Sequence, residues 1–124
     1  MILDSNIIIY SAMPEHQKVR DFLKENETDL AVSAITKLEV LGYNKLSADD
    51  KELFEEFFQT ITVLPVSSSI IEKAISLRQQ RKMSLGDSLI AATSLMSNHK
   101  LFTNNVEDFN GIDSLSIISM QSIL

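Results

Sequence analysis

The chain contains no cysteine and no tryptophan, and only three glycines and two prolines occur among its 124 residues. The absence of cysteine excludes disulfide bonds and thiolate metal ligands and fits a reducing compartment, so we expect a cytoplasmic protein. With 44% hydrophobic residues, so little Gly and Pro predicts a folded chain rich in regular structure. No apolar run reaches the length of a membrane span, and the N-terminus lacks a basic segment, so we expect no membrane association.

Positive charge is also scarce, because 11 Lys and Arg stand against 17 Asp and Glu, for a net charge of −6. Bulk electrostatics therefore do not favour a nucleic-acid-binding protein. One local exception is the basic group formed by Arg78, Arg81 and Lys82, shortly before Asp87. Spacing alone favours a solvated helix end, stabilised by the helix dipole, over an RNA contact at this basic group.

Short apolar runs alternate along the chain with segments of helical periodicity, and the length favours one domain over residues 1–124. The expected strands are 2–3, 30–32, 61–66, 100–103 and 115–118. The expected helices are 6–13, 15–26, 34–45, 48–59, 67–81 and 85–96, with a helical turn at 106–109. This alternation predicts an α/β fold of three layers around a mostly parallel five-stranded sheet.

The apolar periodicity also predicts which helix faces point inward. In helix 34–45 we expect the core face to carry Ile35, Leu38, Leu41 and Val40. In helix 48–59 the expected apolar face consists of Leu53, Phe54, Phe57 and Phe58, with core packing favoured over a subunit interface. Helix 85–96 is apolar nearly all round and is therefore expected to be buried.

Four acidic residues, Asp4, Glu39, Asp87 and Asp108, each follow a short apolar run and lie at or near the start of a predicted helix. Taken singly, each is better explained as part of a helix cap, because Thr36–Glu39 and Ser84–Asp87 match the capping-box pattern. Taken together, they indicate a site, because ligands of parallel sheets bind beyond the carboxyl ends of the strands.

A cluster of such carboxylates needs a compensating cation. At ~5 Å and an effective dielectric near 20, two carboxylates repel by about 3 kcal/mol. Oxygen ligands of this kind suit Mg²⁺ or Mn²⁺. The two histidines, His16 and His99, fall outside the cluster and are expected at the surface, and no zinc spacing, serine-histidine-aspartate order or phosphate-binding glycine loop is present.

Four segments of the sequence, at 2–6, 33–39, 87–93 and 103–109, together resemble the PIN-domain ribonucleases of the VapC toxin type. The resemblance covers nearly the whole chain and implies a three-layer α/β/α PIN-like domain in which the four acidic residues hold Mg²⁺ or Mn²⁺. It also implies a supporting shell of polar residues, namely Ser5, Asn6, Thr36 and Asn105. Asn6 would orient Asp4 or a bound water, and Thr36 would orient Glu39.

The function implied by this resemblance is endonucleolytic hydrolysis of RNA by metal-activated water. Such proteins are often homodimers and toxins paired with a small antitoxin, here expected to carry a basic inhibitory segment. The alternative is a non-catalytic PIN-like module that binds RNA or a partner. A phosphoacceptor receiver domain is disfavoured, because Asp4 stands alone after the first strand and no Asp follows the third.

Overall fold

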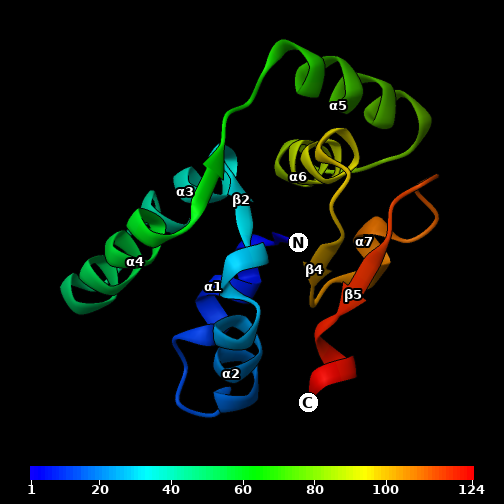
Figure 1. Ribbon diagram of the computed structural model, residues 1–124. Coiled ribbons are helices and arrows are strands. Elements are labelled where there is room, and N and C mark those ends of the chain that lie inside the picture. The colour runs from blue at the N-terminus through cyan, green and yellow to red at the C-terminus, as the bar shows by residue number, and fades with distance from the viewer.

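A computed structural model describes residues 1–124 and contains five parallel strands (Figure 1). The strands are β1 (Ile2–Leu3), β2 (Ala31–Ser33), β3 (Thr62–Leu64), β4 (Leu101–Thr103) and β5 (Ile117–Ser119). The α-helices are α1 (Ser5–Ser11), α2 (Gln17–Glu25), α3 (Ala34–Leu41), α4 (Ala48–Thr60), α5 (Ser68–Gln80), α6 (Leu85–Ser97) and α7 (Val106–Phe109). Two 3₁₀ turns are η1 (Glu27–Asp29) and η2 (Met120–Ile123). The order β3-β2-β1-β4-β5 places β1 at the centre of the sheet.

The strand register separates the core into two halves. Ile2 pairs with Ala31 and with Leu101, and Leu3 pairs with Phe102. Because successive side chains of a strand point to opposite faces, Ile2 and Leu101 lie on one side and Leu3 and Phe102 on the other. The predicted three-layer α/β/α fold with a parallel five-stranded sheet is therefore confirmed.

Each half of the core is closed by its own set of helices. Ile2 packs with residues of α5, α6 and α7, which include Ala74, Ile90 and Phe109. Leu3 packs with residues of α1, α2, α3 and α4, which include Ile7, Val19, Val40 and Phe54. In Figure 1 α5 lies across α6, away from α1, α2 and α4.

Serine side chains cap most of the long helices. Ser33, Ser47, Ser67 and Ser84 each precede a helix and accept a hydrogen bond from one of its first backbone N–H groups. Of the two capping boxes considered as an alternative explanation of the acidic residues, the cap at Ser84 is formed and the cap at Thr36 is not. Since α3 already begins at Ala34 behind Ser33, Thr36 lies inside the helix and is fully buried.

Two of the residues expected in the core are exposed. Leu38 of α3 has 65% of its surface exposed, because this short helix buries the face of Thr36 and Val40 instead. Leu53 of α4 is 49% exposed, whereas its neighbour Phe54 is buried. The predicted burial of α6 holds for 88–94 but fails at both ends of the helix, where Leu85 and Met96 are exposed. No helix is both long and apolar enough to cross a membrane.

Candidate active site

The Asp4 side chain is the most constrained group at the carboxyl end of the sheet. Asp4 directly follows β1, is only 4% exposed, and donates its backbone N–H to the Phe102 carbonyl at 3.0 Å. Its Oδ1 accepts from the Ser5 backbone N–H at 2.8 Å, which makes it the N-cap of α1, and its Oδ2 accepts from the Thr103 hydroxyl at 2.7 Å. Hydrogen bonds from α1 and β4 thus fix both oxygens of this carboxylate.

Glu39 approaches the same place from α3. Its Oε1 accepts a hydrogen bond from the Ser5 hydroxyl at 2.8 Å. Its Oε2 lies against Gly86 in the first turn of α6, so closely that a Cβ atom on Gly86 would be 2.7 Å away. The absence of a side chain at Gly86 therefore allows the start of α6 to come close to the Glu39 carboxylate.

Asp87 and Asp108 come from α6 and α7. Asp87 lies in the first turn of α6 and donates its backbone N–H to the Ser84 hydroxyl oxygen at 3.1 Å. Asp108, in the four-residue helix α7, lines the same cavity of about 550 Å³ as Asp87. The basic group of Arg78, Arg81 and Lys82 lines this cavity as well. The fold therefore brings the basic group next to two of the four carboxylates.

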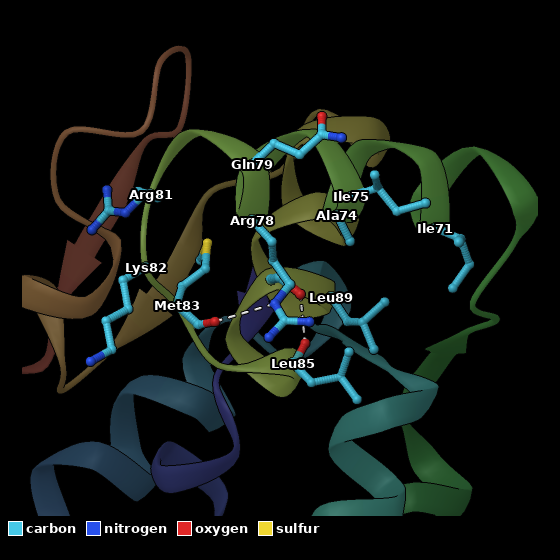
Figure 2. Close-up of a pocket in the computed structure, with 11 residues that line it drawn as sticks. Ile71, Ala74, Ile75, Arg78, Gln79, Arg81, Lys82, Met83, Leu85 and Leu89 are labelled. Carbon is cyan, nitrogen blue, oxygen red and sulfur yellow. Dashed lines mark hydrogen bonds between the residues drawn. The ribbon is translucent and has the colours of Figure 1, made fainter.

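The three members of the basic group are oriented differently, as Figure 2 shows. Arg78 extends into a groove between α5 and α6 and donates from Nε to the Met83 carbonyl at 3.3 Å. Arg81 and Lys82 point away from the apolar side chains of that groove (Figure 2). Arg81 instead donates to two backbone carbonyls at the end of α7, those of Asp108 and Asn110.

Electrostatic coupling joins all four acidic residues. Burial is the largest cause that raises the pKa of Asp4 above 3.8, and the charges of Glu39 and Asp108 raise it further against hydrogen bonds from Thr103 and Ser5. Burial also raises the pKa of Asp87, and the charges of Asp4 and Asp108 add to that effect. Asp4 and Asp87 are therefore partly desolvated and lie within the field of other carboxylates, and both conditions favour a bound proton or a nearby cation.

The chemistry of these four carboxylates fits a hard divalent cation. The structure contains no group of three or more Asp, Glu or His side chains already close enough together to hold a metal ion. Mg²⁺, however, is commonly held by only one or two carboxylates and keeps several of its waters. The residues that would hold it are Asp4, Glu39, Asp87 and Asp108, and no imidazole joins them. His16 packs against Tyr10 and His99 is exposed.

The predicted supporting residues take different places. Ser5 binds Glu39, whereas the hydrogen bonds to Asp4 come from Thr103 and Ser5 and not from Asn6. The hydroxyl of Thr36 is buried without a hydrogen-bond partner. The hydroxyl that binds Glu39 is therefore that of Ser5 and not, as predicted, that of Thr36. Asn105 precedes α7 without a side-chain cap bond, and its backbone N–H donates to the Thr103 hydroxyl oxygen at 2.9 Å.

Two residues of this site were missing from the sequence-based set. Thr103 donates a hydrogen bond to the Asp4 carboxylate, and the sequence marked it only as a hydroxyl at the end of a predicted strand and as the first residue of the segment 103–109. Gly86 lies in the first turn of a long helix, where glycine destabilises the helix. A glycine at such a position indicates that another group packs closely against it, and this was the feature of the sequence that could have identified Gly86.

The raised pKa of Asp4 gives a pH-dependent stability that Asp4→Asn should remove. Because the folded carboxyl holds its proton more tightly than the unfolded one, its contribution is fully present below pH 3.8 and is lost as the pH rises through the folded pKa. Asn keeps the capping oxygen. In urea denaturation without divalent cations, the variant should gain stability relative to the wild type as the pH rises, by ~1.4 kcal/mol per unit of raised pKa. A difference that is constant from pH 3 to pH 8 would contradict this account.

Comparisons with known proteins agree with the fold. The PIN domain profile matches residues 1–115. A toxin-antitoxin complex from Klebsiella pneumoniae matches with 28% identity and a TM-score of 0.77, covering 95% of both chains. VapBC2 from Rickettsia felis, at 20% identity, has a TM-score of 0.83 over 95% of this chain and 96% of that chain. VapBC-1 from Haemophilus influenzae, at 23% identity, has a TM-score of 0.78 with the same coverage.

No curated protein gave a significant match. The family profile nevertheless spans nearly the whole chain, and the fold is the one found in solved VapBC complexes. The chain belongs to the PIN domain family.

Proposed function

We propose that this protein is a metal-dependent endoribonuclease and the toxin of a toxin-antitoxin pair. The observation that carries the proposal is the buried Asp4 carboxylate, which is electrostatically coupled to Glu39 and Asp108 and raises the pKa of Asp87 in turn. A purely capping role does not account for this, since capping needs one oxygen and no second charge nearby. Membership of the PIN domain family supports nuclease chemistry at this place.

The roles of the side chains follow from their positions. A Mg²⁺ or Mn²⁺ ion bound here would lower the pKa of a water and neutralise charge on the phosphodiester. Asp4, Glu39 and Asp87 would hold that ion, directly or through the waters that it keeps, and Asp108 would hold a second ion or a water. Ser5 keeps Glu39 in place, and Thr103 keeps Asp4 in place.

RNA would approach over the basic group. Arg78, Arg81 and Lys82 line one cavity with Asp87 and Asp108, so a phosphate there would be attracted by the cations and brought next to the carboxylates. This local arrangement offsets the net charge of −6, which would otherwise repel a polyanion.

The partner we propose is a small antitoxin with a basic inhibitory segment. An arginine of that segment could pair bidentately with the carboxylate of Glu39 or Asp87 and occupy the place of the cation. Glu39 also lines a cavity of about 660 Å³ whose other residues include the apolar Ile9 and Met13 and the aromatic Tyr43, where apolar partner side chains could pack. The similarity to the solved toxin-antitoxin complex from Klebsiella pneumoniae supports such a partner.

We further propose a homodimer. The groove between α5 and α6, of about 690 Å³, exposes Ile71, Ile75 and Leu85 (Figure 2). Exposed apolar side chains that gather at one place mark a surface suited to protein contact.

We expect that an acidic residue is required for hydrolysis because of its position in the site and not merely because of its negative charge. In Asp87→Asn the fold should persist while cleavage of single-stranded RNA with Mg²⁺ or Mn²⁺ falls at least about a hundredfold. Glu107→Gln is the matched control, since it removes one negative charge from the same cavity at a residue outside the four carboxylates. Wild-type rates for purified Asp87→Asn would refute the assignment, and metal-independent binding of RNA without cleavage would favour the non-catalytic module.

Gly86→Ala should separate activity from stability. The added methyl group would lie 2.7 Å from Glu39 Oε2 and must displace that flexible carboxylate, whereas alanine is by itself better than glycine in a helix by about 1 kcal/mol. We therefore expect an unfolding midpoint at or above that of the wild type, together with RNA cleavage lowered about tenfold or more. Met96→Ala, at an exposed position near the other end of α6, controls for a change within this helix. Full activity of Gly86→Ala would show that the position of Glu39 does not matter.

A further inference from the structure

Arg81 connects two elements that are far apart in the sequence. It lies one residue beyond the end of α5, and its guanidinium reaches the end of α7. Nη1 donates to the Asn110 carbonyl at 2.6 Å, and Nη2 donates to the Asp108 carbonyl at 3.3 Å. Both acceptors belong to the main chain, so the contact fixes the backbone that carries the Asp108 carboxylate.

Helix α7 needs such an anchor because it has only four residues. A helix of this length is not stable through its own hydrogen bonds, and the last carbonyls of any helix lack partners within it. The side chain of Asn105 makes no capping bond at its start, and Phe109, which is fully buried, is its one apolar anchor. Directly after Asn110, Gly111 adopts a φ of +83° and turns the chain away.

We propose that Arg81 is a positioning residue that holds α7, and with it the Asp108 carboxylate, in place for the metal-dependent site. This inference rests on the proposed function, and it assigns Arg81 a task different from that of its neighbours in the basic group. Arg78, in the last turn of α5, donates to the Met83 carbonyl in the loop that follows this helix, and Lys82 makes no hydrogen bond to α7. The alternative, a direct contact of Arg81 with RNA phosphate, becomes an outcome of the test.

The experiment compares full-length wild type, Arg81→Gln and the charge-matched control Lys82→Gln. Amide hydrogen exchange at 106–110 reports the anchoring of α7, and calorimetric titration with Mn²⁺ reports the site. Arg81→Gln should exchange faster at these amides and bind Mn²⁺ about tenfold more weakly. Lys82→Gln should leave the exchange unchanged and bind Mn²⁺ as well as the wild type or better, because it removes a positive charge beside the cation.

Kinetics and a double-mutant cycle separate positioning from RNA contact. Arg81→Gln should lower kcat about tenfold and raise KM no more than Lys82→Gln, which removes the same charge, whereas a direct phosphate contact would appear mainly in KM. In an Asp108→Asn background, Arg81→Gln should cause little further loss of Mn²⁺ affinity, since both changes act on the same carboxylate. If Arg81→Gln does not fold, Arg81→Lys, which keeps the charge and can reach one carbonyl, should give an intermediate Mn²⁺ affinity.

Three results would overturn the proposal. The first is hydrogen exchange at 106–110 that is the same in Arg81→Gln as in the wild type. The second is a Mn²⁺ affinity of Arg81→Gln equal to or above that of Lys82→Gln. The third is a kinetic effect of Arg81→Gln that is confined to KM. A wild type that neither binds Mn²⁺ nor cleaves RNA would instead refute the proposed function, and the proposal with it. Hydrogen exchange would then still show whether Arg81 holds α7.

Discussion

The burial of the Asp4 carboxylate is the constraint on which the rest of the site depends. Removing a carboxylate from water is costly unless hydrogen bonds or a counter-charge compensate. Here the Thr103 hydroxyl and the Ser5 backbone N–H supply two hydrogen bonds, yet burial still outweighs them and the pKa of Asp4 is raised. The surrounding carboxylates increase that cost, and the cation that we propose for this site would offset it.

The strand order determines how this arrangement is assembled. Because β1 lies between β2 and β4, the carboxyl end of β1 is flanked by Thr103 at the end of β4 and by the start of α3 after β2. Asp4 and Thr103 are thereby brought within hydrogen-bonding distance although 99 positions separate them. Gly86 then allows the first turn of α6 to approach Glu39. The site is thus formed where the ends of β2 and β4 flank β1 and where α6 contacts Glu39.

The sequence was sufficient to predict the general architecture, and the structure brings the four acidic residues that it singled out within electrostatic reach of one another. The alternation of apolar runs and helices determines the three layers, and acids that follow the strands collect at one edge of a parallel sheet. The strand order was not visible in the residues, so the bond from Thr103 to Asp4 could not be foreseen. Helical periodicity likewise did not show that Leu38 and Leu53 lie outside the core. It shows which residues share one face of a helix, but not which other element, if any, packs against that face.

The residues that support the carboxylates also show that the sequence does not reveal which side chains meet in the fold. The sequence places Thr36 one turn before Glu39, which suggests a contact, but in α3 the side chain of Thr36 faces the core. Ser5, brought to Glu39 by the packing of α1 on α3, takes that place instead. Short-range spacing therefore singled out the acidic residues, whereas tertiary packing decided which hydroxyl bonds Asp4 and which bonds Glu39.

The most direct test of the central claim is an NMR titration of the Asp4 and Asp87 side-chain carboxyl carbons with and without Mg²⁺. Without the cation, both should titrate above the ordinary aspartate pKa of 3.8, since burial and mutual repulsion favour the protonated form. Saturating Mg²⁺ should lower both pKa values, because a bound cation favours the ionised carboxylates. Ordinary pKa values without Mg²⁺, or raised values that Mg²⁺ leaves unchanged, would contradict the claim that these carboxylates form a cation site.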